Sequence, residues 1–162
     1  MPPHNVIARQ KSISGQHLAY RTNYLDLDPA YKDSLDDPLL RMTLDWNDNE
    51  HNMIAFLTAK MAPVGRAMGA REVMVTPLPR HYDVNTYKTT HLQGGTIMGT
   101  NHGNSVVNTW LKHWQMPNLF VLGASTFPQN ASGNPTLTIL AQTLRTADAI
   151  VDRYLKRPGP LG

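Results

Sequence analysis

The chain has 162 residues, 41% of them hydrophobic and 17% charged, so it can form one ordinary globular domain but hardly two. Its net charge of +3 comes from basic residues scattered singly, which argues against a nucleic-acid-binding surface. It has no cysteine, which excludes disulfide scaffolds, thiolate zinc sites and cysteine nucleophiles.

The N-terminal segment, residues 1–38, is polar and rich in turn-forming residues, and we expect it to be irregular. Residues 39–44 alternate in side-chain polarity, which predicts a strand with one buried face. The apolar run at residues 73–75 stops at a proline-rich turn and predicts another strand. No apolar stretch approaches the roughly 20 residues that cross a bilayer, and the N-terminus lacks the apolar core of a signal peptide. We therefore expect a chain that is soluble or reaches a membrane only through partners.

An amphipathic helix is predicted between these strands. Residues 49–68 place apolar side chains at spacings of one, three and four, the pattern of a helix with one apolar face. Asp48 or Asn49 is the expected N-cap, and Gly69 lies just past the expected end. Pro63 falls inside the helix, where we expect it to kink the helix or to start a new turn.

A glycine-rich loop opens the second half of the chain. Residues 91–103 include four glycines, which allow the backbone to approach another group closely. Residues 118–122 have the pattern of a buried strand, closed by a Gly-Ala-Ser turn.

A long helix closes the sequence. Asn134 is expected at its N-cap and Pro135 at its first helical position. Lys156 and Arg157 follow its last apolar residues and complement the negative end of the helix dipole. The apolar stripe consists of Leu137, Leu140, Leu144, Ala147, Ile150, Val151, Tyr154 and Leu155.

Several kinds of catalytic site are poorly supported by the residues. The seven histidines form no HExxH motif and no i, i+4 pair, so a metal site has little support. Ser125 lacks the Gly-x-Ser-x-Gly elbow of a hydrolase nucleophile. No GxGxxG motif follows an expected strand and no Walker-type phosphate loop is present, so the chain shows no dinucleotide-binding half.

The C-terminal part of the chain combines a histidine before a glycine-rich loop with Asn-Pro at a helix start. That helix start offers backbone N–H groups from Thr136 and its neighbours, and the positive end of a dipole, to an anion or an electron-rich ring edge. A neutral His91 opposite it could take a proton from an alcohol as hydride leaves the carbon. By pattern alone, a plain N-cap at Asn134 and a surface histidine at position 91 are the commoner interpretation.

Four segments occur in the order in which one enzyme family has them. They read HLQGGTIMG at residues 91–99, SVVN at 105–108, NLFVLGASTFP at 118–128 and NPTLTI at 134–139. With the closing LRTADAI at 144–150, they closely resemble the C-terminal part of the glucose–methanol–choline (GMC) oxidoreductases. The segment around residues 24–46 more loosely resembles the substrate-domain stretch of the gluconate 2-dehydrogenase branch.

The resemblance implies a fold class and a division into domains. We expect an α/β (α+β) chain: a substrate domain with antiparallel strands and packed helices, including helix 49–68 on the strands, plus the last strand and long helix of the FAD-binding domain. Residues 1–84 would belong to the substrate-binding domain, 85–157 would be the active-site and FAD-contacting segment, and 158–162 a tail. The family's N-terminal GxGxxG region is absent from this sequence, so we expect a fragment, a truncated gene product or an expressed C-terminal piece.

The resemblance also implies an FAD enzyme that oxidises an alcohol or a sugar. His91 matches the family's first active-site position and would be the base for the substrate hydroxyl. Asn134 matches the second position, and would orient that hydroxyl and adjoin the cofactor. We expect the fragment alone to lack this activity.

Cofactor contacts are implied at two further places. The helix start at Pro135 and Thr136 would face the pyrimidine end of the flavin, where N–H groups and the helix dipole stabilise negative charge. Gly123 and Ala124 would pass close to the cofactor through their backbone.

Two departures from the family pattern qualify this transfer. His91 precedes Thr96 by five residues, whereas many members have four, so either the loop has an extra residue or the base is displaced. His102 is the alternative base. Many members also have an aspartate where Gly123 stands, which removes a side-chain contact near the cofactor.

Partners and location follow from the resemblance alone. The expected partners are the missing FAD-binding region, a substrate that is a sugar, a sugar acid or an alcohol, and a small subunit with a cytochrome as electron acceptor. Nucleic acid is not an expected partner. By resemblance the location is the periplasmic side of the bacterial inner membrane through partner subunits, otherwise the cytoplasm. The competing hypotheses are a non-catalytic remnant that serves at most as an interaction surface, and a sugar-binding module, for which three tryptophans offer few stacking platforms.

Overall fold

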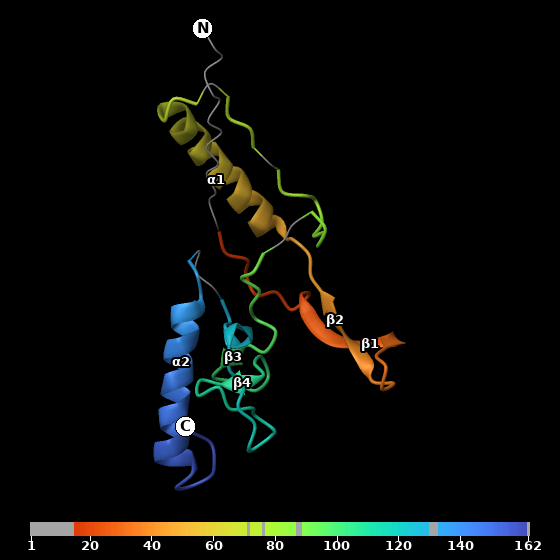
Figure 1. Ribbon diagram of the computed structural model, residues 1–162, viewed down its shortest axis with the longest axis vertical. Helices are drawn as coiled ribbons and strands as arrows, with labels where there is room; N and C mark the ends of the chain where they lie inside the picture. The colour runs from red at the N-terminus through yellow and green to blue at the C-terminus, as the bar shows by residue number, and fades with distance from the viewer. Residues whose placement is uncertain (1–14, 71, 76, 87–88, 130–132, 162) are drawn as a thin grey trace.

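The computed structural model describes residues 15–70, 72–75, 77–86, 89–129 and 133–161. Its elements are β1 (Tyr24–Lys32), β2 (Pro38–Thr43), α1 (Asp48–Ala67), β3 (Met98–Gly99), β4 (Val107–Asn108), a 3₁₀ turn η1 (Ala124–Thr126), α2 (Thr136–Ala149) and a π-helical turn η2 (Ile150–Tyr154). In Figure 1, α1 lies at one end, the β1–β2 ribbon projects to one side, and α2 lies beside β3 and β4. The expected mixture of helices and strands is confirmed. No helix in these ranges is long and apolar enough to cross a bilayer.

β1 and β2 form an antiparallel ribbon with one apolar and one polar face. Leu25 pairs with Met42 and Leu27 with Leu40, so these four side chains share one face. All four are exposed, because no described helix or further strand covers that face and the loop at Gly95 touches only Leu25 among them. Two expectations are therefore wrong: residues 24–32 are a strand rather than irregular, and the strand at 38–43 has no buried face.

The polar face of the ribbon is joined by an ion pair across the two strands. Arg41 Nε donates to Asp26 Oδ1 over 2.9 Å, and these residues are cross-strand partners. The pairing register is interrupted between Leu27 and Lys32, where Pro29 has no N–H to give to the ladder. A two-residue strand pair elsewhere, β3 with β4, is parallel, so the strands are not all antiparallel.

The predicted helix at residues 49–68 is confirmed as α1, but its cap and its neighbours differ from the expectation. Asn47, not Asp48 or Asn49, is the N-cap, and its N–H donates to Glu50 Oε2 over 3.0 Å. Gly69 has φ +83°, the left-handed conformation that suits the residue just past a helix. The helix continues through Pro63.

α1 does not pack on the β1–β2 ribbon. Its neighbours are two irregular segments: residues 17–20, which bond Glu50, and residues 73–75 with 77–78, which lie along the side of the helix. The distance from an added Cβ on Gly65 to Val73 would be 3.1 Å, which shows how closely the second segment lies against the helix. Residues 73–75, expected as a strand, have no strand partner.

The core of the described chain lies between residues 107–127 and α2. It consists of Val107, Leu111, Phe127, Ala149 and Leu161. Residues 118–122, expected as a buried strand, form no strand and make only an isolated bridge between Lys112 and Phe120. The backbone of this segment is hydrogen-bonded locally instead, because the segment folds back on residues 111–113 through single hydrogen bonds.

The closing helix is confirmed as α2 continued by η2. Its N-cap is Pro135 rather than Asn134, which is exposed and makes no capping bond. The apolar stripe faces solvent: Leu137 is 80% exposed and Leu144 65%. Periodicity identifies an apolar face of a helix, but it does not say which element, if any, covers that face.

Candidate functional site

Two segments expected at the site meet through their backbones. Gly94 N–H donates to Ala124 O over 3.3 Å, and Thr96 N–H donates to Ser125 O over 2.8 Å. Gly94 has φ +86°, which an L side chain rarely adopts, and an added Cβ would lie 3.5 Å from the Phe127 carbonyl. The loop that follows His91 is therefore docked on η1.

The two candidate bases lie at opposite ends of this loop. His91 is exposed, its N–H donates to Thr89 Oγ1 over 3.1 Å, and its carbonyl accepts from Gln93 Nε2 over 3.4 Å. His102 is exposed in the turn after β3, whose Gly103 N–H donates to Asn101 Oδ1. In the described ranges neither imidazole makes a hydrogen bond, so both are accessible to a ligand, and the choice between them stays a prediction.

The turn that contains Gly123 and Ala124 leaves open space beside the backbone. Gly123 has φ +107°, and an added Cβ there would meet no atom within 4 Å. Thr126, which is fully buried, donates its hydroxyl to Gly123 O over 2.8 Å and so fixes the turn from inside. The backbone of Gly123 is thus open on one side, as a close approach to a flat group requires.

The start of α2 presents backbone donors that make no hydrogen bond to the described residues. The first helical bond runs from Ile139 N–H to Pro135 O at 3.0 Å, so the N–H groups of Thr136, Leu137 and Thr138 precede the helical ladder. Pro135 is buried and Asn134 is exposed. Such a helix start favours an anion or a partial negative charge. The structure places no hydrogen bond between Asn134 and His91.

The docked loop also contains two buried acceptor atoms without a donor. Gln93 Oε1 and Thr96 Oγ1 are both inaccessible and make no hydrogen bond in the described part of the chain. Gln93 Nε2 bonds the His91 carbonyl, so the opposite amide orientation would set two oxygens against each other. Buried acceptors of this kind are usually satisfied by a ligand or by water.

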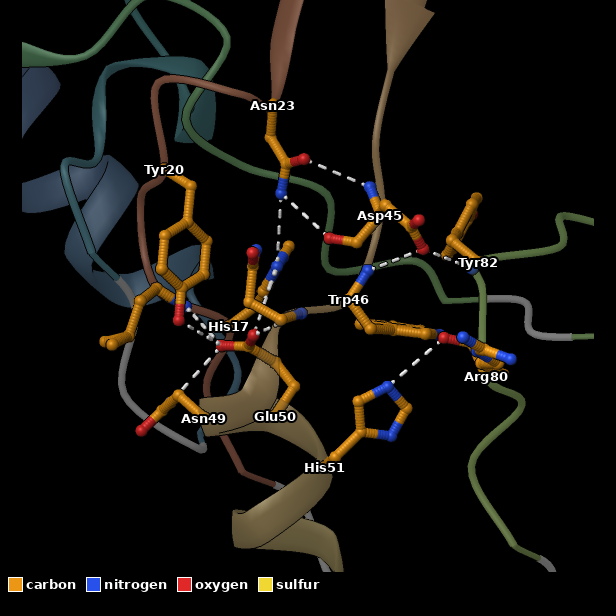
Figure 2. A network of polar contacts seen from close by, with 12 residues as sticks. His17, Tyr20, Asn23, Asp45, Trp46, Asn49, Glu50, His51, Arg80 and Tyr82 are labelled. Carbon is orange, nitrogen blue, oxygen red and sulfur yellow. Dashed lines mark hydrogen bonds and ion pairs between the residues drawn. The ribbon is translucent and has the colours of Figure 1, made fainter.

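A second polar cluster, centred on Glu50 and Asp45, joins the start of α1 to two irregular segments (Figure 2). Glu50, only 1% exposed, accepts from Leu18 N–H, Tyr20 Oη, Asn47 N–H and Asn49 Nδ2. Burial by itself would raise the pKa of Glu50, but these hydrogen bonds outweigh it and lower the pKa below its usual 4.5.

Asp45 holds the other side of this cluster. The imidazole of His81 lies 2.7 Å from its Oδ2, and the backbone N–H groups of Tyr82 and Trp46 donate to Oδ1. These contacts, with His81 as the largest cause, lower the pKa of Asp45 from 3.8 to about 2. Asn23 bonds the Asp45 backbone on both its N–H and its carbonyl.

Sequence reasoning missed this cluster. The Asn-x-x-Glu spacing from Asn47 to Glu50 is a capping-box signal and would have identified Glu50. Nothing in the sequence placed His81 beside Asp45, because the contact joins segments far apart in the chain. In the ranges the structure covers, no three His, Asp or Glu side chains gather as metal ligands.

Comparison with known proteins identifies the family. A family model described as GMC oxidoreductase matches residues 19–143. The chain is 47% identical over 149 residues, 91% of its length, to the gluconate 2-dehydrogenase flavoprotein of Pantoea cypripedii. It is 35% identical over 80% of its length to the fructose dehydrogenase large subunit of Gluconobacter japonicus, and 34% over 86% to 2-methyl-1,2-propanediol dehydrogenase of Mycolicibacterium austroafricanum.

The coverage of these relatives is as informative as the identity. The aligned part is 24%, 23% and 24% of the gluconate, fructose and propanediol enzymes, so the chain spans about a quarter of their length. The match includes the docked loop, η1 and the start of α2. The chain belongs to the GMC oxidoreductase family and corresponds to the family's C-terminal domain.

Proposed function

We propose that this chain is the C-terminal part of an FAD-dependent oxidoreductase that oxidises the CH–OH group of a sugar, a sugar acid or another alcohol. The observation that carries the proposal is the docking of the loop after His91 onto η1 through Gly94 and Thr96. This contact joins the loop that carries the candidate base, His91, to the turn that carries the open backbone of Gly123. The names of the relatives, which are dehydrogenases of gluconate, fructose and a diol, support the substrate class.

The residues present fit a flavin at three points. Gly123 offers a backbone that a flat ring can approach, and the start of α2 at Thr136 offers N–H donors and a positive dipole end. Gln93 Oε1 and Thr96 Oγ1 are buried acceptors that a ligand's N–H or O–H groups would satisfy. Bound flavin would supply the chemistry that these residues lack, because it accepts the hydride that leaves the alcohol carbon.

The chain's own residues would orient the alcohol and move its proton. His91, exposed and without a hydrogen bond on its ring in the described structure, would take the hydroxyl proton. Asn134, exposed at the start of α2, would hydrogen-bond the same hydroxyl. His102 remains the alternative base, since the turn that carries it also faces solvent.

The exposed apolar faces support the domain division and the need for partners. Residues 1–84 would belong to a substrate-binding domain, 85–157 to the active-site and FAD-contacting segment, and 158–162 to a tail. The stripe on α2 would pack on the FAD-binding region that the family resemblance implies. The proposal also includes a small subunit and a cytochrome that accepts the electrons, in line with the name of the fructose relative, a large subunit. Through such partners the protein would lie on the periplasmic side of the membrane; otherwise it would be cytoplasmic.

A second candidate function, a non-catalytic fragment, is favoured by the many exposed leucines. Both candidates predict the same fold for the residues that the structure describes. They differ in whether the loop and helix start take part in chemistry.

Stopped-flow reduction of the flavin in the complete protein that carries this chain tests the proposal. We expect His91→Ala to slow reduction about 10²- to 10⁴-fold, as loss of a general base does. Asn134→Ala should also slow it, without loss of stability, because Asn134 makes no cap bond. His102→Ala is the matched control. Unchanged reduction in His91→Ala with loss in His102→Ala would transfer the role to His102, and loss in neither would leave the non-catalytic fragment.

A further inference from the structure

The C-terminal helix is fastened to the rest of the chain around one indole ring. The guanidinium carbon of Arg145 lies 3.8 Å from the centroid of the Trp110 ring, and that of Arg153 lies 4.8 Å from it. Arg145 Nη1 also donates to the carbonyl of Thr109 over 2.6 Å. Trp110 sits in the turn that follows β4.

This arrangement resists sliding of the helix in either direction. Arg145 and Arg153 are eight residues apart, about 12 Å along a helix, yet both reach the same ring, so the ring lies between them. A shift of one residue, about 1.5 Å, would lengthen one of the two contacts. Among described residues, the other side-chain hydrogen bonds from α2 and η2 to the rest of the chain come from Thr146 and Tyr154.

The turn that presents the ring is itself rigid. Asn108 Oδ1 accepts from Trp110 N–H over 2.9 Å and from Lys112 N–H over 3.1 Å. Val107 and Leu111, on either side of the turn, are fully buried. Leu111 has φ +60°, a conformation that a leucine adopts only where the surroundings fix it. Trp110 is therefore a fixed point against which the helix is placed.

We propose that Arg145 is a positioning residue for the reaction: its stack on Trp110 sets where α2 stands along its axis, and so where Asn134 and the Thr136 N–H lie. This inference rests on the proposed function. Thr136, the first residue of α2, is about 14 Å from Arg145 along the helix, a helix transmits an axial shift unchanged, and Asn134 precedes Thr136 by two residues. A displacement of about 1 Å in such a group costs up to about hundredfold in rate.

Kinetics of the complete flavoprotein provide the first test. Arg145→Lys keeps the charge but loses the planar stack and the fork, and Arg145→Met loses the charge as well. We expect both to lower the rate of flavin reduction about 10- to 100-fold, with Arg145→Met the slower, while the substrate dissociation constant changes less than threefold. Arg157→Met is the matched control, because the Arg157 side chain makes no hydrogen bond or ring contact in the described structure, and its rate should stay unchanged.

A distance measurement tests the position of the helix without relying on activity. The chain has no cysteine, so Leu137→Cys and Met116→Cys, both at exposed positions, can carry the only two spin labels in this chain. Pulsed electron resonance on the protein without substrate should give one narrow distance distribution. Arg145→Lys and Arg145→Met should shift or broaden it, and Arg157→Met should not.

The two measurements separate the two proposals. A distribution that is unchanged in both Arg145 variants overturns the positioning role. A changed distribution with an unchanged reduction rate also overturns it, because the contact would then be structural only. If His91→Ala, His102→Ala and Asn134→Ala all leave the rate unchanged, the proposed function fails, while the distance data still decide whether Arg145 fixes the helix.

Discussion

The N–H of Thr96 donates a 2.8 Å hydrogen bond to the carbonyl of Ser125, and this bond joins the glycine-rich loop to η1. It is reinforced by the longer bond from Gly94 to Ala124. Both are backbone bonds, so the docking depends on loop conformation more than on side chains. Gly94, with φ +86°, makes that conformation accessible.

Substitution of the two loop glycines should have different effects on stability. Gly94→Ala places a side chain at φ +86° and should cost about 1–2 kcal/mol. Gly95→Ala would instead bring its Cβ to 2.7 Å from Leu25 Cδ1, the movable end of a partly exposed side chain. We therefore expect Gly95→Ala to be the milder change. Urea unfolding of each variant measures both effects.

The double substitution distinguishes the two mechanisms. Leu25→Ala should rescue Gly95→Ala, because it removes the clashing atom. It should give no rescue of Gly94→Ala, whose cost is in the backbone. Equal rescue of both variants would contradict the assignment of strain to Gly94.

Removing one acceptor from the buried carboxylate should destabilise the protein. Glu50→Gln replaces one oxygen by an amide NH2, which then faces either the donors of Leu18 and Tyr20 at the Oε1 position or the Asn47 N–H at the Oε2 position. An unsatisfied buried donor costs about 1–3 kcal/mol, and we expect a loss of that size in the free energy of unfolding. The exposed Glu72→Gln is the control and should change it by less than about 0.5 kcal/mol. Equal losses in the two variants would refute a special role for Glu50.

Stability should fall in acid in a way that depends on Asp45. Its pKa is about 2 in the folded chain, below the usual 3.8, so the folded state favours the charged carboxylate. That contribution is complete above about pH 4 and is lost as the pH falls toward 2. Thermal unfolding at a series of pH values should therefore show a smaller acid-induced loss in Asp45→Asn than in the parent protein.

A matched surface variant checks that the acid effect is local. Asp148→Asn changes an exposed aspartate on α2, a different element from the segments that hold Asp45 and His81. It should retain the full loss of melting temperature between pH 4 and 2. If both variants reduce the loss of melting temperature between pH 4 and 2 equally, the net charge of the protein rather than the contact of Asp45 with His81 is responsible.

How much of this protein could be predicted differs from element to element. The 3.6-residue periodicity predicted α1 and α2 within one or two residues at each start, because side-chain spacing along one helix is a local property. The motifs around His91 and Asn134 indicated the family that the comparisons confirm. The strand β1 was missed because its alternating Leu and Asp residues lie in a segment dominated by polar turn formers.

The tertiary structure alone decided which surfaces meet. Residues 118–122 were expected as a buried strand, but they fold back on residues 111–113, since no neighbouring strand pairs with them in the described chain. The placement of His81 against Asp45, and of Arg145 against Trp110, joins residues that no local pattern relates. Sequence periodicity and motifs determined the helices, the family and the candidate chemistry because these depend on neighbours along the chain. The docking of the loop on η1 and the exposure of the α2 stripe depend on long-range contacts, which only the folded chain specifies.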